Sequence, residues 1–326
     1  MTNLRSLIQS TGAYRTVKGD KENGRLSHAY LILTPDGDNL GEYLKLFASL
    51  MACEGKDACG ECRSCRLISD NAYSDVIFYP KKSGAMATEE VSELIEESFL
   101  KPIESDKKIF VINNAESMNT VAQNKLLKTL EEPPKGVHII LGATNEHSLL
   151  QTVKSRVKKL EIPAFNKEQL FSALKDECED PESLSIAIAC SDGTVGGVRK
   201  LYGDKKFQQT VELALDVLVN MKSSKDVLEY SLKISKLSED ITEFISVMGL
   251  LLRDLLVINE GAEDLAFNQS AVSKLTEAER FNRGAIVYAL EAVTEAQRRK
   301  RFNANATMLT EWLLFQILEG KYKWQK

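Results

Sequence analysis

The chain has 326 residues, of which 43% are hydrophobic and 27% are charged, and its formal net charge is −5 at pH 7. This length is enough for two or three domains of ordinary globular composition. No apolar run approaches the roughly 20 residues needed to cross a bilayer, and residues 1–20 lack the apolar core of a secretory signal, so we expect a cytoplasmic protein. The negative charge argues against nucleic-acid binding by the whole surface, although a local basic patch is compatible with phosphate contacts.

The first hundred residues alternate between short apolar runs and helical patterns. The apolar run after His28 ends at Thr34-Pro-Asp-Gly37, a set of turn residues, and therefore predicts a strand followed by a turn. The predicted elements in chain order are an amphipathic helix with a polar loop over 1–26, a strand over 28–33, a helix over 41–53, a strand over 74–80 and a helix over 89–100.

Four of the six cysteines lie close together, at Cys53, Cys59, Cys62 and Cys65. Disulfides are rare in cytoplasmic proteins, so the cluster predicts a metal site, and four thiolates close the tetrahedral shell of a structural zinc ion. Catalytic zinc is disfavoured because no position remains for water, whereas an iron–sulfur cluster takes the same ligands and stays open as an alternative. Four unrelated core cysteines are a poor interpretation, because polar residues separate them. Cys178 and Cys190 are interpreted as lone core thiols.

Residues 107–156 contain the strongest pattern in the chain. Two continuous apolar runs, Ile109–Ile112 and Val137–Gly142, predict strands that are buried on both faces. Between them, Thr120–Leu130 places Val121 and three leucines on one stripe of a helix, which two prolines then end. A strand, a helix and a strand within about 40 residues predict a right-handed parallel crossover.

The same stretch carries a family resemblance. Asn124–Pro134 reads NKLLKTLEEPP and is followed by Thr144-Asn145 and by Ser155-Arg156, and this order resembles the clamp-loader branch of the AAA+ ATPases. The leucines taken alone would be plain core, but eleven matching residues in order with two further motifs are a specific signal. The resemblance implies an α/β AAA+ module, with a parallel sheet flanked by helices, followed by a small helical lid and an all-α collar. It also implies a zinc module where the four cysteines stand.

The resemblance places an ATP-binding loop after the first predicted strand. ATP-binding members of the family have lysine and then Ser or Thr in this loop, because the lysine neutralises phosphates and the hydroxyl holds magnesium. Gly37 and Gly41 remain here, but Glu42 and Tyr43 occupy those two positions, and a carboxylate repels a triphosphate. We therefore interpret the loop as degenerate and expect no bound ATP. A return of Lys45 toward a phosphate is the weaker alternative.

The residues after the second buried strand favour the same interpretation. Active relatives have acidic residues there for magnesium and for water activation, whereas this chain has Asn113, Asn114 and then Glu116. Asparagine does not neutralise magnesium, and Glu116 alone is weakly suited to polarise water. We interpret the two asparagines as helix-capping or strand-end residues. Thr144 and Asn145, at the position that senses the γ-phosphate in active relatives, are interpreted as a strand-end cap.

Ser155 and Arg156 are expected on a helix over residues 149–157. Relatives usually read Ser-Arg-Cys, so Val157 departs from the pattern while the serine and the arginine remain. In clamp loaders this arginine reaches the ATP of the adjacent subunit and stabilises charge on the transferred phosphoryl group. The resemblance thus implies that Arg156 is an arginine finger acting in trans, with Ser155 as its motif partner. The alternative is an ordinary surface arginine.

Other titratable residues give weaker signals. The three histidines, His28, His138 and His147, have no ligand spacing with one another and are interpreted as structural. Arg199 matches the second sensor of the family only loosely. The basic cluster Arg298–Arg301 is more typical of a solvated face than of a DNA contact.

The rest of the chain is predicted to be helical after a last strand at Leu160–Pro163. The predicted helices span 167–177, 182–190, 194–202, 205–222, 224–236, 239–258, 271–297 and 303–319. We therefore expect three domains: an ATPase-like domain over 1–163 with a zinc module at 53–65, a lid over 164–203, and an oligomerising collar over 204–326.

The resemblance therefore implies a clamp-loader subunit of the DNA polymerase III holoenzyme, and the two degenerate motifs predict that it is catalytically inactive. The resemblance implies gamma/tau and delta subunits as partners, and contact with the sliding clamp and primer–template DNA through the assembled complex. We expect structural zinc, no ATP, no membrane contact, and a place in the cytoplasmic, nucleoid-associated replisome. Two alternatives remain, an active gamma/tau-type ATPase and a stand-alone zinc-dependent nucleic-acid-binding protein.

Overall fold

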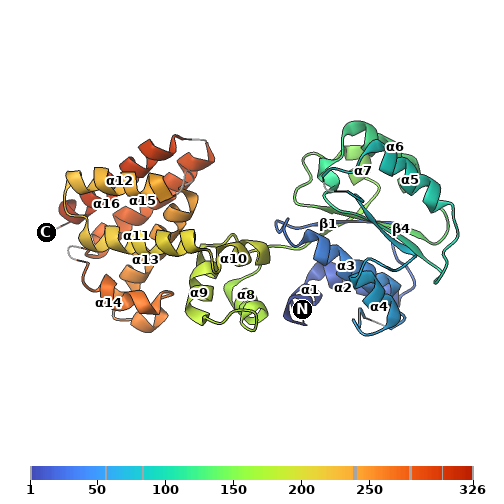
Figure 1. Ribbon diagram of the computed structural model, residues 1–326, viewed down its shortest axis with the longest axis horizontal. Coiled ribbons are helices and arrows are strands. Elements are labelled where there is room, and N and C mark those ends of the chain that lie inside the picture. The colour runs from blue at the N-terminus through green and yellow to red at the C-terminus, as the bar shows by residue number, and fades with distance from the viewer. Residues whose placement is uncertain are drawn as a thin grey trace. The chain divides into compact units, whose positions relative to one another are not determined.

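The structure is a computed structural model that describes residues 2–55, 57–82, 84–237, 241–278, 281–302 and 304–324. The chain divides into two compact units (Figure 1). The first unit runs to Leu174 and also includes Thr194–Gly196, and the second contains Lys175–Gly193 and the residues from Gly197 onward. Within the described residues, no helix has both the length and the apolar character needed to cross a bilayer.

The first unit is built on a five-stranded sheet with the order β2–β3–β4–β1–β5. Its strands are β1 (Ala29–Leu33), β2 (Val76–Tyr79), β3 (Lys108–Ile112), β4 (Val137–Ala143) and β5 (Lys158–Glu161). All four neighbouring pairs are parallel, and β3 is buried at every position, which explains its continuous apolar sequence. The predicted strands are confirmed, although β5 begins two residues before the predicted start.

Helices cover both faces of this sheet (Figure 1). The helices of the first unit are α1 (Thr2–Gln9), α2 (Gly12–Glu22), α3 (Leu40–Ala52), α4 (Arg63–Ser69), α5 (Thr88–Ser98), α6 (Thr120–Glu131), α7 (Gln151–Lys154) and α8 (Lys167–Leu174), and among them α2 and α3 contact the sheet directly. The N-terminal segment holds two helices instead of the one predicted, because Thr11 caps a second helix by accepting a hydrogen bond from the backbone N–H of Tyr14. Helix α4, inside the cysteine loop, was not predicted.

The predicted crossover is present, since α6 connects the parallel neighbours β3 and β4. Leu126 and Leu130 of α6 are buried in the core against one face of the sheet, with residues such as Phe110 and Ile139. The predicted apolar stripe is wrong at Val121, whose side chain is 64% exposed in the first turn of the helix.

The second unit is helical throughout its described residues. Its longer helices are α9 (Pro181–Cys190), α11 (Lys205–Asn220), α12 (Ser224–Leu237), α13 (Thr242–Asn259), α15 (Arg283–Arg301) and α16 (Ala306–Lys323), with the short α14 (Val272–Leu275), and α10 (Val195–Leu201) begins in the first unit. The prediction of one helix over 271–297 is wrong. Helix α14 ends at Leu275, and Asn282 starts α15 by accepting from the backbone N–H of Ala285.

Candidate functional site

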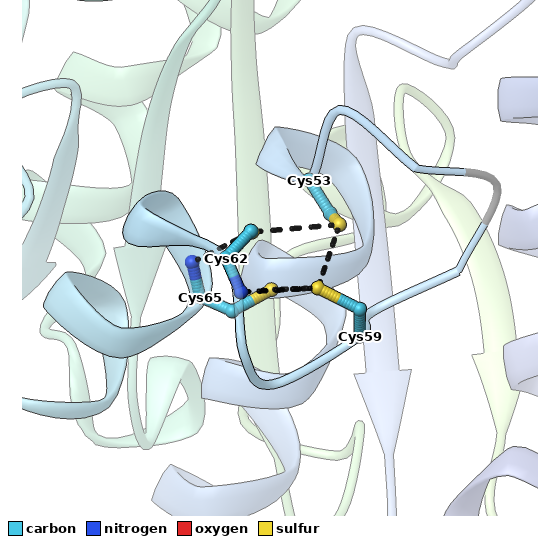
Figure 2. A group of neighbouring side chains, drawn as sticks. All are labelled: Cys53, Cys59, Cys62 and Cys65. Carbon is cyan, nitrogen blue, oxygen red and sulfur yellow. Dashed lines mark hydrogen bonds between the residues drawn. The ribbon is translucent and has the colours of Figure 1, made fainter.

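The four clustered cysteines converge on one point at the C-terminal end of α3. Cys53 follows α3, Cys59 lies in the loop, Cys62 caps α4, and Cys65 lies in the first turn of α4. Figure 2 shows the four side chains facing one another. The Sγ–Sγ distances are 3.6 Å for Cys53–Cys59, 3.7 Å for Cys53–Cys62 and 4.0 Å for Cys59–Cys65, and all four sulfur atoms lie within 4.8 Å of one another.

These distances fit a tetrahedral metal ion. A Zn–S bond of about 2.3 Å gives tetrahedral S–S edges of roughly 3.8 Å, whereas a disulfide requires about 2.05 Å. The sulfurs also accept backbone hydrogen bonds, from Cys62 N–H to Cys59 Sγ at 3.3 Å and from Cys65 N–H to Cys62 Sγ at 3.4 Å. The N–H groups of Cys62 and Glu61 lower the pKa of the Cys59 thiol to about 6, whereas burial raises the pKa of the Cys62 and Cys65 thiols. The chain thus holds a four-cysteine site that can bind a metal ion such as zinc.

The loop between β1 and α3 is closed by one buried carboxylate. Asp36 is only 3% exposed. Its Oδ1 accepts from the backbone N–H and the side-chain amide of Asn39, at 3.2 and 3.0 Å, and its Oδ2 accepts from the Tyr43 hydroxyl at 2.6 Å. The same Oδ2 accepts from the backbone N–H groups of Val195 and Gly196, at 3.0 and 3.2 Å. A β-carbon on Gly196 would lie 2.7 Å from Oδ1, so this approach requires glycine.

The backbone of this loop turns its N–H groups toward its own acceptors. Asp36 N–H donates to Thr34 Oγ1 at 3.3 Å, Gly37 N–H to the Pro35 carbonyl at 3.2 Å, and Leu40 N–H to the Gly37 carbonyl at 3.4 Å. A phosphate-binding loop instead directs such groups at the ligand. Tyr43 is buried and donates to Asp36, so its hydroxyl already serves an internal bond.

The residues after β3 join the ends of two strands. Glu116 Oε1 accepts from the backbone N–H and the hydroxyl of Thr144, at 2.8 and 2.7 Å. Within the described residues, Glu116 Oε2 and Asn113 Oδ1 are buried without a hydrogen-bond partner. Asn114 has a positive φ of 53° and precedes a short 3₁₀ helix, but its side chain makes no capping bond, so the predicted capping role is wrong for this residue.

Arg156 lies just after α7 and not on it, at the rim of an open concavity. Its guanidinium donates to the Thr152 carbonyl at 2.8 Å and to Ser155 Oγ at 3.1 Å, and it forms an ion pair with Glu131. The concavity has a volume of about 590 Å³, and its lining includes Glu131, Ser155 and Arg156. The Arg156 side chain is 33% exposed, so the guanidinium is held in a defined position that remains accessible.

Sequence reasoning missed Gln123, which is 2% exposed on α6. Its side-chain amide donates to the carbonyls of Met118 and Ser148, at 2.9 and 3.0 Å, and its Oε1 accepts from Leu150 N–H at 2.8 Å. It therefore fixes the segment that leads into α7. The signal in the sequence was a polar residue on the buried side of α6, between Ala122 and Leu126.

The other candidates have ordinary structural partners. His138 Nδ1 lies 2.8 Å from the Ser27 carbonyl, and burial lowers the pKa of this histidine. Arg199 pairs with Glu177 at 2.8 Å. In the basic cluster, Arg298 and Arg299 both bind Glu295 at 2.8 Å, and the side chain of Arg301 lies outside the described residues. In the part of the chain that the structure describes, the four cysteines form the one group of potential metal ligands.

The fold and the sites define a doubly wound α/β domain with a closed loop after its first strand and a four-cysteine metal site. The model of the family described as "DNA polymerase III, delta subunit" matches residues 9–166. The DNA polymerase III subunit delta' of Bacillus subtilis is 26% identical over 92% of this chain and 93% of its own length. The subunit tau/gamma of Haemophilus influenzae is 33% identical over 52% of this chain and 26% of its own length. A solved gamma-subunit-related protein of Thermotoga maritima is 19% identical, covers 98% of this chain and 99% of its own, and has a TM-score of 0.40. The chain belongs to the DNA polymerase III delta' family, as residues 124–156 predicted.

Proposed function

We propose that the chain is a clamp-loader subunit that does not bind ATP and that donates Arg156 to the ATP site of a neighbouring subunit. It would assemble with gamma/tau and delta subunits and help to load the sliding clamp onto primer–template DNA. In this arrangement residues 1–163 form an ATPase-like domain of the AAA+ type, residues 164–203 a lid and residues 204–326 an oligomerising collar. Membership of the delta' family supports the assembly.

The buried Asp36 carboxylate carries the proposal that ATP is not bound. A triphosphate needs donors in this loop, but the loop presents a negative group whose oxygens already accept hydrogen bonds from Asn39, Tyr43, Val195 and Gly196. Glu42 adds a second carboxylate in the first turn of α3. Binding ATP here would require breaking these bonds and placing like charges together, and each of these changes is unfavourable.

The geometry of Arg156 supports its role in trans. An arginine finger must be ordered before its partner arrives and must still be reachable. The bonds to Thr152 and Ser155 order the guanidinium, while the open concavity around it leaves access. Glu131 would keep the finger in place in the free subunit, and a γ-phosphate would compete with that carboxylate.

One observation favours the alternative of an ATPase of the gamma/tau type. An open concavity of about 460 Å³ at the ends of β2 and β3 is lined by Lys45, Lys81 and Lys82, together with Gly41 and Asn113. Two of these lysines already have partners, since Lys45 donates to the Ser69 carbonyl at 3.1 Å and Lys81 pairs with Glu93. The third alternative, a stand-alone zinc-dependent nucleic-acid-binding protein, predicts tight DNA binding without partner subunits.

Equilibrium binding of ATP to the isolated chain tests the first part of the proposal. We expect no binding at millimolar ATP, with one zinc ion per chain in the same sample. Micromolar binding would instead establish the gamma/tau-type ATPase, and the loop at Asp36 would have to open in solution.

The second part is tested in the assembled complex with the Arg156→Ala variant. We expect turnover at the ATP site that it contacts to fall by about 1000-fold, because an arginine finger stabilises charge in the transition state. Total ATP hydrolysis by the complex would then fall by the fraction that this site contributes, and the complex would still assemble. Arg66→Ala, which removes an exposed arginine from α4, is the matched control. Equal turnover for the wild type and Arg156→Ala excludes the finger.

A further inference from the structure

One lysine holds the chain on both sides of the first cysteine. The Lys21 ammonium on α2 donates to the carbonyls of Leu50, Cys53 and Gly55, at 2.7, 2.5 and 2.7 Å. An ammonium has three N–H groups, so these bonds use its whole donor capacity. Leu50 lies in the last turn of α3 and Gly55 lies two residues beyond Cys53, so Lys21 fixes where α3 ends and how the cysteine loop begins.

The position of Cys53 creates an electrostatic problem that Lys21 offsets. The last carbonyls of a helix lack intrahelical partners and give its C-terminal end a partial negative charge. Cys53 directly follows this end of α3, so a metal-bound sulfur there adds negative charge beside the carbonyls of Leu50 and Cys53. Four thiolates around a divalent ion leave a net charge of about −2. A positive charge bound to the carbonyls of Leu50 and Cys53 opposes both sources of negative charge.

A second anchor holds the loop midway between Cys53 and Cys59. The Asp57 carboxylate accepts from Lys18 at 2.6 Å, from Gln9 at 3.3 Å, from the backbone N–H of Ala58 at 2.8 Å and from the Tyr14 hydroxyl. Lys18 and Tyr14 lie on α2, the helix that also carries Lys21. The cysteine loop is therefore attached to α2 at two places, through the carbonyls of Cys53 and Gly55 and through the side chain of Asp57.

We propose that Lys21 is a positioning residue of the four-cysteine site, and that it strengthens metal binding by fixing Cys53 and by balancing the charge of the thiolates. Lys21 does not touch the metal. It acts through the carbonyls of Cys53, Leu50 and Gly55 and holds the first ligand near the positions of the other three. Loss of outer partners of metal ligands typically weakens metal binding by about 10- to 100-fold.

The test is zinc affinity of the full chain, measured by competition with a chromophoric chelator. Lys21→Met keeps the apolar stem but removes the charge and the donors, and we expect zinc to bind about 10- to 100-fold more weakly with one ion per chain retained. Cobalt(II) substituted for zinc reports the ligands, and we expect the tetrahedral thiolate spectrum to persist. Lys158→Met is the matched control, because Lys158 binds Asp20 of the same helix at 2.6 Å and makes no bond to the described residues of the cysteine loop. This control should keep the wild-type affinity.

The same measurements separate positioning from plain structural support. If Lys21 only stabilised the fold, Lys21→Met would lower the melting temperature of the metal-free chain and leave zinc affinity unchanged, and that outcome overturns the proposal. If Lys21→Met does not fold, Lys21→Gln replaces it, since glutamine keeps a donor but has no charge. A folded Lys21→Gln variant should bind zinc more weakly than Lys158→Met, and equal affinities would again refute the role of Lys21.

Discussion

The loops at the two ends of α3 direct their polar atoms in opposite ways. At its N-terminal end, the loop around Asp36 directs its polar atoms at one another and at Val195 and Gly196. At its C-terminal end, the cysteine loop directs four sulfur atoms at a common point, where all four lie within 4.8 Å of one another. The carboxylate of the first loop has all its partners within the protein, whereas the four sulfur atoms of the second loop surround a position that a metal ion can occupy.

This comparison shows that the direction of polar atoms, more than their number, distinguishes a loop that satisfies its own polar groups from a loop that can hold a metal ion. Both loops are anchored by side chains or backbone groups from distant segments. The carboxylate of Asp36 accepts hydrogen bonds from within the protein. Lys21 and Asp57 instead hold the cysteine loop, whose sulfur atoms can bind an ion. Changes at the two ends of α3 should therefore differ in whether they alter metal content or only stability.

The largest effect is expected from Cys65→Ser, because Cys65 is a buried ligand at the start of α4. The variant should lose zinc and the stabilisation that zinc supplies, about 4 kcal/mol in the free energy of unfolding when free zinc exceeds its dissociation constant by about 1000-fold. Metal analysis and urea unfolding with and without chelator measure both. Cys178→Ser is the control and should retain one zinc ion, and full zinc content in Cys65→Ser would rule out the four-cysteine site.

The next effect is expected at the other end of α3, from Asp36→Ala. Removing the carboxylate leaves the buried N–H groups of Val195 and Gly196 without their acceptor, which should lower the free energy of unfolding by about 3 kcal/mol. Zinc content should not change. Asp38→Ala alters an exposed aspartate of the same loop and should stay within about 0.5 kcal/mol of the wild type. Equal stability of the two variants would mean that Asp36 does not close the loop.

A smaller effect is expected from Gly196→Ala. The added β-carbon would lie 2.7 Å from Asp36 Oδ1 and 2.8 Å from Asp38 Cβ, so the loop must shift, at a cost of about 2 kcal/mol. Gly19→Ala is the control, because a β-carbon there meets no atom within 4 Å and alanine favours a helix by up to about 1 kcal/mol. Thermal unfolding of the two variants should therefore shift in opposite directions, and a neutral Gly196→Ala would contradict the close approach.

The comparison also shows what the sequence could reveal. The cysteine ligands lie within one short segment, so their spacing alone predicted the site, and the buried strands were legible as continuous apolar runs. The hydrogen bonds of Asp36 join residues about 160 positions apart, and no local sequence pattern predicts them. Sequence reasoning therefore predicted that Glu42 and Tyr43 replace the ATP-binding residues, but it did not identify Asp36 as the group that closes the loop.

Lys21 was missed for the same reason, since its three acceptors are backbone carbonyls, which every residue has. The prediction of one helix over 271–297 was wrong for a local reason. Helical periodicity continues on both sides of the break, and only the capping bond of Asn282 marks the new start. Family resemblance suggested the fold and the role proposed for Arg156, whereas the contacts that order its guanidinium came from the structure.

The smallest effects are expected from removing the hydroxyl of either of two buried tyrosines, Tyr14 and Tyr30. Comparing the two variants separates a contribution to zinc binding from a contribution to stability. Tyr14 donates to Asp57 in the cysteine loop, and Tyr30 donates to Asp20 on α2 at 2.8 Å. Burial, followed by Asp57, raises the pKa of Tyr14 to about 12, so its phenol is protonated and donates at neutral pH. Tyr14→Phe and Tyr30→Phe should each lower the free energy of unfolding by about 1 kcal/mol, since each loses one hydrogen bond. Only Tyr14→Phe should also weaken zinc binding, because Tyr14 binds the loop between Cys53 and Cys59 and Tyr30 binds Asp20 instead. Equal zinc affinities for the two variants would show that the Asp57 anchor stabilises the fold without organising the metal site.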